Sequence, residues 1–338
     1  MDFSLFYFAD DADSGDRYRL LLEGARFADT HGFAAVWTPE RHFHRFGGLF
    51  PNPAVAAAAV AAVTTRVGVR AGSVVAPLHH PVRIAEDWAM VDNLSHGRAG
   101  ISLASGWNPQ DFLLAPDSYE RRRELTVEAI GTLRKLWRGE PCPEGPPGGI
   151  YPRPVQADPP IWLTSGGSLP TFEAAGRLGV GVLTNLLTYE LDALPARVRA
   201  YRQAYAAAGH PGRGHVALML HACLGDDREA ALAVARPPLH RYLMTSLDLN
   251  LRAAGLPVGA GPPPGAEVPA VVARAADRYL ERDGLFGTVG DALGVVRRAA
   301  DAGVDEIACL IDFGVPIDAA LAGLDRLDEL RRGVSLAR

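Results

Sequence analysis

The chain has 338 residues, 48% of them hydrophobic, and its 34 Lys and Arg against 39 Asp and Glu give a net charge of −5. Both charge signs are spread along the sequence, which argues against the clustered basic surface that nucleic acid or an anionic membrane requires. The longest apolar stretch, Ala54–Val63, is far shorter than the roughly 20 residues that span a bilayer. The N-terminus lacks the basic start and long apolar segment of a signal peptide. We therefore expect a cytoplasmic protein that binds neither nucleic acid nor membrane.

Short apolar runs rich in Val, Ile and Phe alternate with stretches of helical period, the pattern of βαβ units and a parallel sheet. The predicted strands are Phe3–Phe8, Ala34–Thr38, Val67–Val75, Ala99–Leu103, Pro160–Thr164, Gly181–Thr184, Val216–Cys223 and Glu306–Ile311. The predicted helices are Asp16–His31, Pro53–Val63, Pro81–Leu94, Tyr119–Trp137, Pro170–Leu178, Glu190–Ala208, Arg228–Ala235 and Ile317–Arg332. Eight such units favour a closed (β/α)8 TIM barrel over an open doubly wound sheet, so we expect one α/β domain over residues 1–338.

Residues 237–287 interrupt this alternation. Two helices, Leu239–Ala254 and Ala270–Arg282, are expected to flank the Pro/Gly-rich run Leu256–Pro269. Such a run cannot build a packed core, so we expect an insertion before the last barrel units, with a lid as its candidate role. The segment Glu140–Pro160 is a second long loop, between the fourth and fifth strands.

The reactive groups of such a barrel are expected just beyond the C-terminal ends of its strands. The densest polar cluster there follows the second strand and contains Arg41, His42 and His44. A histidine can act as general acid or base near neutral pH, and an arginine can hold an anion. A structural role for His42 is an equally good interpretation. No metal site is expected, because these histidines alternate faces on an extended chain and the three cysteines lie far apart.

The fifth strand is followed by a glycine-rich helix start. Gly166 and Gly167 allow a tight turn, Ser168 can cap the next helix, and Thr171 adds a hydroxyl beside free backbone N–H groups. This is the composition of an anion or phosphate cradle, and a plain well-capped loop is the alternative. No Walker lysine and no GxGxxG fingerprint is present, so an ATP or dinucleotide site is not expected.

The third strand contains Gly72 and Ser73 where β-branched residues would be usual, which indicates that backbone closely approaches another group.

Three long segments carry a resemblance to a known family: FAAVWTPERHFHRFGGLFPNP, VRAGSVVAPLHHPVRIAEDWAMVDNLSHGRAGISLASGWNPQDF and PIWLTSGGSLPTFEAAGRLGVGVLTN. They closely resemble the bacterial luciferase-like flavin-dependent monooxygenases, and the similarity runs over nearly the whole chain. The strings LASGWNP, TSGGSLPTFEAAG, YLMTSLDL and AGVDEIACLIDFG are similar to the branch found in nonribosomal peptide and polyketide biosynthesis.

This resemblance implies a (β/α)8 barrel that binds reduced FMN at the barrel top, uses O2 as co-substrate and receives its flavin from a separate reductase. It also implies a non-prolyl cis peptide under the flavin ring, which maps onto Gly72–Ser73. The flavin phosphate would lie on the loop after the fifth strand. The residues then expected to contact the cofactor are Gly72, Ser73, Ser105, Gly106, Trp107, Gly166, Gly167, Ser168, Thr171 and Asn185.

Three positions depart from luciferase. Ser105 stands where luciferase has a phosphate-binding arginine, so phosphate affinity must depend more on backbone N–H groups or another basic residue. Luciferase has two adjacent histidines after the second strand, where this chain has Arg41 and then His42. Luciferase's reactive cysteine position is Ala104. Light emission from an aldehyde is therefore not implied.

The resulting prediction is an FMN-dependent monooxygenase that oxygenates an intermediate of natural-product biosynthesis, either a free small molecule or one tethered to a carrier protein. His42 is the expected proton donor or acceptor, and Arg41 the anion-stabilising or substrate-orienting group. The resemblance also implies a homodimer. Two alternatives stay open: an oxidoreductase of the same fold that uses the deazaflavin F420, and a non-catalytic flavin-binding subunit.

Overall fold

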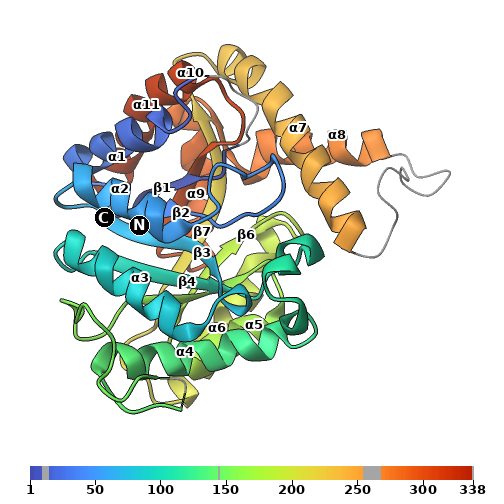
Figure 1. Ribbon diagram of the computed structural model, residues 1–338. Helices are drawn as coiled ribbons and strands as arrows, with labels where there is room; N and C mark the ends of the chain where they lie inside the picture. Colours follow the sequence, from blue (N-terminus) through green and yellow to red (C-terminus); the bar gives the residue numbers. More distant parts are fainter. Residues whose placement is uncertain (10–14, 144, 254–267, 337–338) are drawn as a thin grey trace.

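The computed structural model describes residues 1–9, 15–143, 145–253 and 268–336. Its centre is a ring of eight parallel strands, closed by pairing of β6 with β7 and of β9 with β1, which confirms the predicted barrel (Figure 1). The ring runs β1 (Asp2–Tyr7), β2 (Ala35–Thr38), β3 (Gly68–Val75), β4 (Ala99–Ala104), β5 (Ile161–Ser165), β6 (Gly181–Asn185), β7 (Val216–Leu224) and β9 (Glu306–Asp312).

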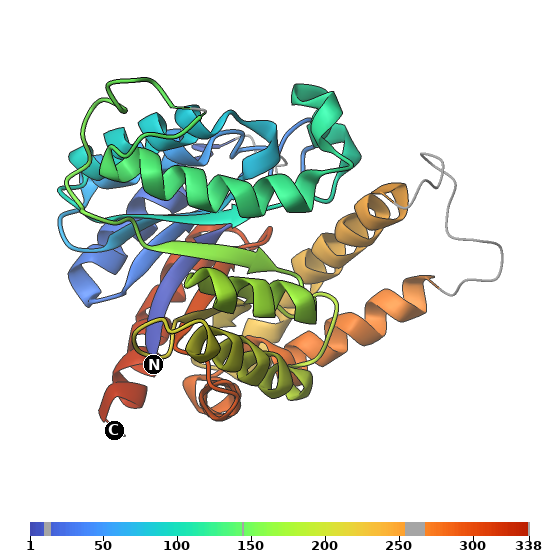
Figure 2. The same ribbon diagram turned by 90° about the horizontal axis from the view of Figure 1, so that it is seen from below.

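Helices surround the ring on the outside (Figures 1 and 2). They are α1 (Arg19–His31), α2 (Pro53–Val63), α3 (Pro81–Leu94), α4 (Arg122–Arg138), α5 (Leu169–Leu178), α6 (Leu194–Ala207), α7 (Arg228–Ala253), α8 (Val268–Arg278), α9 (Val289–Asp301), α10 (Ile317–Ala322) and α11 (Leu324–Leu336). Each of the eight predicted strands corresponds to a strand of the ring. A short additional strand, β8 (Leu285–Gly287), pairs with the end of β7, and neither it nor α9 was predicted.

The sequence predicted a helix that ends at Ala235 and a second one that begins at Leu239, but α7 runs through Pro237 and Pro238 without a break. Proline removes a backbone donor and usually ends a helix. Here Ala235 and Leu239, one turn apart on the same face, are both fully buried, so packing against the barrel outweighs this local cost. Beyond the barrel α7 and α8 extend side by side as a projecting arm (Figures 1 and 2). Residues 256–267 of the predicted Pro/Gly-rich run lie outside the described residues.

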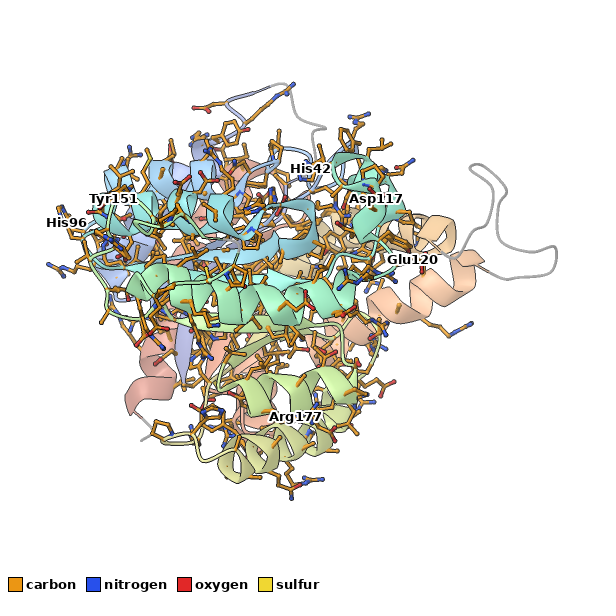
Figure 3. All side chains as sticks on the ribbon, turned by 60° about the horizontal axis from the view of Figure 1, so that its bottom comes forward. His42, His96, Asp117, Glu120, Tyr151 and Arg177 are labelled. Carbon is orange, nitrogen blue, oxygen red and sulfur yellow. The ribbon has the colours of Figure 1, made fainter. Side chains whose placement is uncertain are left out.

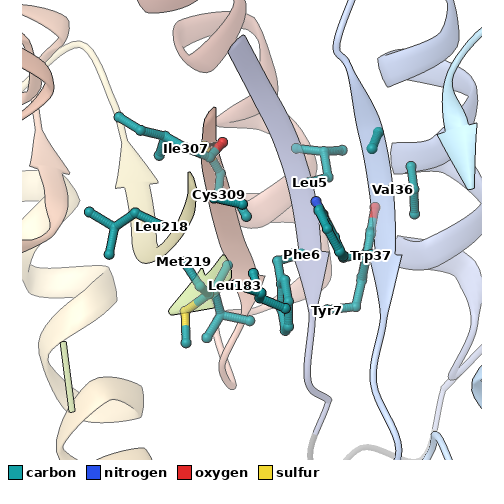
Figure 4. Packing of buried hydrophobic residues seen from close by; sticks show 14 of the residues in the cluster. Leu5, Phe6, Tyr7, Val36, Trp37, Leu183, Leu218, Met219, Ile307 and Cys309 are labelled. Atoms are coloured by element: carbon teal, nitrogen blue, oxygen red, sulfur yellow. Dashed lines mark hydrogen bonds between the residues drawn. The ribbon is translucent and has the colours of Figure 1, made fainter. Parts of the chain in front are cut away.

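The hydrophobic core lies between the outer face of the barrel and the helices. Leu5, Val36, Leu218 and Ile307 on neighbouring strands are completely buried there (Figure 4). Because side chains alternate along a strand, the residues between them point into the barrel. The polar residues Ser4 and Glu306 occupy such inward positions and contact each other.

The N-terminal half of the barrel interior is filled by an ionic and aromatic layer around Glu306. This carboxylate accepts hydrogen bonds from Ser4 Oγ at 2.6 Å, from Trp37 Nε1 at 2.9 Å and from Arg70 Nη1 at 2.7 Å. The Arg70 guanidinium lies between two indoles, 5.0 Å from the ring of Trp37 and 4.7 Å from that of Trp162. These contacts fill the N-terminal half of the barrel interior.

The loop Glu140–Pro160 precedes β5 and therefore belongs to the closed N-terminal end. Asp92, which is buried on α3, accepts the backbone N–H groups of Val155 at 2.7 Å and Gln156 at 2.9 Å and thereby fixes the loop. Figure 3 shows Tyr151 of this loop, with His96, on the opposite side of the molecule from His42 and Asp117.

Candidate active site

A cavity of about 390 Å³ lies at the C-terminal ends of the strands, within the usual range for small-molecule sites. We call it the main cavity. Its wall comes from the strand ends and from α7. The lining residues are Phe6, Phe8, Pro39, Glu40, Arg41, Phe46, Gly72, Ser73, Val75, Ala104, Ser105, Gly106, Trp107, Asp111, Thr164, Gly166, Leu183, Thr184, Asn185, Leu187, Thr188, Met219, Tyr242 and Ser246.

Most of the predicted site residues meet in this cavity. Those that line it are Arg41, Gly72, Ser73, Ser105, Gly106, Trp107, Gly166 and Asn185. His42, Gly167, Ser168 and Thr171 are not among its lining residues. The main cavity thus brings together segments that follow β2 through β6, as the barrel prediction required.

The floor of the main cavity is the Gly72–Ser73 segment of β3, whose peptide bond is cis, as the resemblance implied. A side chain at Gly72 would meet the Phe6 ring, because its Cβ would lie 2.6 Å from a ring carbon, so only glycine fits. Ser73 forms hydrogen bonds with Ser102 at 3.4 Å and with Thr164. The small residues noted in the sequence therefore bring backbone and hydroxyl groups to the cavity floor.

His42 is held by a carboxylate. Its Nε2–H donates to Glu40 Oε1 at 2.8 Å, and the same oxygen accepts His79 Nε2–H at 2.6 Å. Glu40 Oε2 accepts the backbone N–H of Val75 at 2.7 Å. Burial would raise the pKa of Glu40, but the hydrogen bonds from both histidines outweigh it and lower that pKa. Glu40 therefore stays ionised and fixes both the orientation of the His42 ring and the proton on its Nε2.

His79 is the second partner of this carboxylate. Burial lowers its pKa, but the hydrogen bond to Glu40 and the charge of that residue outweigh burial, so the pKa of His79 is raised above its ordinary value. Together His42, Glu40 and His79 form a hydrogen-bonded chain, of which Glu40 lines the cavity.

Arg41 is the basic side chain among the described lining residues of the main cavity, and it is only 6% exposed. Its Nη1 lies 3.3 Å from Asp111 Oδ2, and its guanidinium carbon lies 4.9 Å from the Trp107 ring and 5.5 Å from the Phe8 ring. Its Nε–H is buried and has no hydrogen-bond partner in the described part of the chain. Arg41 is thus oriented by stacking and only partly neutralised.

The loop after β5 forms the edge of the main cavity. Gly166 lines it, and the space where a Cβ would stand is open, so a ligand can approach its backbone. Gly167 has a φ of 108°, which favours glycine, and its N–H donates to Ser165 Oγ at 3.1 Å. The Ser168 side chain makes no capping hydrogen bond to α5, contrary to the capping role that the sequence suggested.

Arg197 is a basic residue beside this loop that the sequence analysis did not identify. Its Nε donates to the carbonyl oxygen of Gly167 at 2.7 Å, and its guanidinium carbon lies 4.3 Å from the Tyr189 ring. It brings positive charge to the loop after β5, whereas the position of the luciferase arginine, Ser105, follows β4.

A second cavity, of about 280 Å³, adjoins the main one above the ends of β1 and β9. Phe8, Phe46 and Tyr242 line both cavities. Their rings form a wall of edge contacts, with centroids 4.8 Å apart for Phe8 and Phe46 and 4.7 Å apart for Phe46 and Tyr242. The carboxyl of Asp312 also lines the second cavity, and burial raises its pKa to about 7.

In the part of the chain that the structure describes, no group of three or more His, Cys, Asp and Glu side chains is placed to hold a metal ion. None of the described helices is both long and apolar enough to pass through a bilayer.

With this geometry established, the family follows from comparison. Residues 1–306 match the luciferase-like monooxygenase family, so the chain belongs to that family and is an enzyme of the monooxygenase class. It is 28% identical over 224 residues to an uncharacterized protein of Mycobacterium tuberculosis, covering 59% of this chain and 78% of that protein.

Two characterised relatives are more informative. The oxygenase component of flavin-dependent trigonelline monooxygenase from Acinetobacter baylyi is 32% identical over 178 residues, 49% of this chain and 49% of that protein. The crystal structure of monooxygenase RslO1 from Streptomyces bottropensis superimposes with a TM-score of 0.78 and 25% identity, over 97% of this chain and 98% of that one. An F420-dependent secondary alcohol dehydrogenase shares the fold alone, at a TM-score of 0.71 and 16% identity over 98% of both chains.

Sequence reasoning missed Glu40, His79 and Asp111, which hold the predicted residues His42 and Arg41. Glu40 was visible as the acidic residue two positions before His42. Its contact with His79 depends on the pairing of β2 with β3, which brings two segments 39 positions apart together. No spacing rule predicts that contact.

Proposed function

We propose that this enzyme binds reduced FMN in the main cavity and uses O2 to oxygenate an organic substrate. The observation that carries this proposal is the convergence of the Gly72–Ser73 floor and the open Gly166 backbone in one cavity. Backbone N–H groups at a helix start suit a phosphate, and a floor without large side chains suits a flat ring. When bound, the reduced flavin supplies the electrons that activate O2.

The protein residues then have separate tasks. Gly166, Gly167, Ser168 and Thr171, at the start of α5, would hold the phosphate together with the nearby Arg197. The remaining expected cofactor contacts line the main cavity, where the ring would bind; they are Gly72, Ser73, Ser105, Gly106, Trp107 and Asn185.

Proton transfer falls to His42 in this proposal. With Nε2–H fixed on Glu40, Nδ1 would accept or release the proton. Because His42 does not line the main cavity, its proton would reach the reacting atoms through a side-chain movement or an intervening water.

Flavin binding tests the cofactor assignment directly. Titration of the apo-protein with FMN, riboflavin and F420, followed by tryptophan fluorescence, should show FMN binding about tenfold or more tighter than riboflavin. That difference measures the phosphate cradle, since riboflavin lacks only the phosphate. Gly167→Ala should weaken FMN alone, and Gly209→Ala is the control, because Gly209 also has a positive φ but open surroundings. Binding of F420 without FMN would overturn the proposal in favour of hydride transfer.

A second test addresses His42. His42→Ala should reduce the rate at which bound reduced FMN reacts with O2, or the yield of oxygenated product, by about 10²-fold, which is the usual contribution of general acid–base catalysis. The affinity for FMN should be retained. Unchanged kinetics together with normal FMN binding would remove His42 from the mechanism. A wild-type protein that binds FMN but forms no oxygenated product would instead support the non-catalytic flavin-binding alternative.

We further propose that the substrate is a natural-product intermediate, free or tethered to a carrier protein, and that a separate reductase supplies reduced FMN. The first is supported by the similarity of LASGWNP and TSGGSLPTFEAAG to the biosynthetic branch. The second is supported by the relative that is named an oxygenase component. Chromosomal neighbours that encode peptide or polyketide synthases and a flavin reductase would agree with both.

A homodimer is the proposed assembly. Val55 on α2 and Met90 and Leu94 on α3 are exposed apolar side chains on adjacent helices, a surface suited to contact with a second copy. Light scattering after size-exclusion chromatography should give twice the 36.0 kDa chain mass, and Met90→Glu should shift the protein toward the monomer.

A further inference from the structure

The Arg41 guanidinium is a buried charge whose surroundings leave it under-neutralised. Among the described residues its ionic contact is to Asp111 Oδ2, which is long at 3.3 Å, and the other oxygen of that carboxylate already accepts Asn108 Nδ2 at 2.9 Å. Burial lowers the pKa of Arg41 and raises the pKa of Asp111, and in each case it outweighs the attraction between the two. A well-satisfied ion pair would show the opposite directions. An additional anion beside Arg41 would therefore be stabilised.

In the described part of the chain the geometry leaves an unpaired donor beside the main cavity, which an anion can reach after a small shift of the covering side chains. Arg41 Nε–H is buried, lacks a partner among the described residues, and belongs to a side chain that lines the main cavity. Charge-assisted hydrogen bonds from guanidinium to a planar oxyanion are stronger than neutral ones and fix its orientation. The carboxylates that also line the cavity, Glu40 and Asp111, already accept hydrogen bonds from protein groups.

Aromatic side chains shape the space around this donor. Phe8 and Trp107 stack on the guanidinium, and Phe46 and Tyr242 extend the aromatic surface on the side of the second cavity. Rings packed in this way present flat faces and edges that favour a flat ligand over a branched one.

We propose that the substrate of the main cavity is a planar aromatic anion, with a carboxylate, phenolate or enolate oxygen bound by Arg41 and its ring packed against Trp107 and the Phe8–Phe46–Tyr242 wall. This rests on the proposed function, because it names the substrate class of the same site. Arg41 thereby acts as the specificity-determining residue, which selects charged over neutral substrates of equal size.

A matched pair of probes tests this assignment without turnover. 2-Naphthoate and 2-naphthamide have the same ring and nearly the same shape, but only the first is an anion at pH 7.5. Isothermal titration of the FMN-loaded protein should show naphthoate binding about tenfold or more tighter, the size of one charge-assisted hydrogen bond. Arg41→Gln should abolish the preference, Arg41→Lys should keep part of it, and Arg83→Gln, an exposed arginine on α3, should leave it unchanged.

Three outcomes would overturn the proposal. The wild-type protein could show no preference for naphthoate, or Arg41→Gln could retain the full preference while unfolding at the wild-type temperature. Alternatively, Arg41→Gln could weaken FMN binding tenfold and leave the probe ratio unchanged, which would assign Arg41 to the cofactor. If FMN itself fails to bind, the proposed function fails, whereas the naphthoate preference and its loss in Arg41→Gln can still be measured on the apo-protein.

Discussion

The two ends of the barrel interior use the same residue types with opposite results. At the N-terminal end Arg70 lies between Trp37 and Trp162 and donates to Glu306 at 2.7 Å. At the C-terminal end Arg41 lies between Phe8 and Trp107, but its carboxylate contact is 3.3 Å long and its Nε–H has no partner in the described part of the chain. Arg70 thus has a close carboxylate partner at the N-terminal end, whereas Arg41 at the C-terminal end keeps a hydrogen-bond donor that a ligand can use.

This difference separates stability from function within one fold. A buried polar group that is fully hydrogen-bonded fixes the structure, whereas one left unsatisfied costs free energy unless a ligand supplies the partner. His221 Nε2, on the C-terminal part of β7, is another buried atom without a partner among the described residues. Unpaired polar groups at the C-terminal end of the barrel interior therefore lower the stability of the fold, and the hydrogen-bonded groups at the N-terminal end offset this loss.

The largest expected effect is at the closed end. Glu306→Ala leaves the partly buried Arg70 without its carboxylate, so the free energy of unfolding should fall by roughly 2 to 4 kcal/mol, somewhat less than the loss of a fully buried pair. Urea denaturation measures the change. Glu329→Ala removes an exposed partner of Arg326 and should cost less than about 1 kcal/mol. If Glu306→Ala lowered the free energy of unfolding no more than Glu329→Ala does, the stabilising role of the N-terminal end would be contradicted.

A substitution of Asp312, beside the second cavity, is expected to raise the free energy of unfolding by an intermediate amount. Its pKa rises from 3.8 unfolded to about 7 folded because of burial. Between those pH values the folded state keeps a proton that the unfolded state releases, so the free energy of unfolding decreases as the pH rises. Asp312→Asn should therefore stabilise the protein at pH 8 by roughly 1 to 2 kcal/mol, allowing for partial exposure to the cavity.

The control for Asp312 is the pH dependence itself. The stabilisation should shrink as the pH falls from 7 toward 4 and be absent below 4, where the aspartic acid is neutral in both states. A constant difference across this range, in thermal melts at several pH values, would show that charge is not its cause.

The smallest effect is expected at Glu40, which supports the open end. In Glu40→Gln the pKa of His79 should fall below its ordinary value, because burial then acts without the opposing carboxylate. Proton NMR of the histidine ring measures this directly. In the wild-type protein the raised pKa of His79 adds stability below about pH 6.5, which disappears as the pH rises through the folded value.

The difference in unfolding free energy between wild type and Glu40→Gln should therefore be greater at pH 5.5 than at pH 8.5, by less than about 1 kcal/mol for a partly exposed pair. A His79 pKa that stays raised in the variant would mean that Asp87, also near His79, is the responsible charge.

The eight strands and the cavity floor were predictable because they depend on local patterns. The alternation of apolar runs with helical stretches predicted the strand positions. Gly72 and Ser73 were noticeable as small residues in a strand that is rich in β-branched valines. The hydrogen-bonded chain of His42, Glu40 and His79 was not predictable, because His79 reaches Glu40 only after β2 and β3 pair. The continuity of α7 was missed for the same reason, since burial of Ala235 and Leu239 outweighs the local preference of Pro237 and Pro238.

The aromatic wall between the two cavities has an evolutionary consequence. Phe8 follows β1, Phe46 lies between β2 and α2, and Tyr242 comes from α7, so three distant chain segments contribute one side chain each. Exchanging rings of this wall for small side chains would enlarge the space shared by the two cavities, of about 390 Å³ and about 280 Å³. The size of the ligand that this end of the barrel accepts can therefore change through these side chains while the strands of the barrel stay as they are.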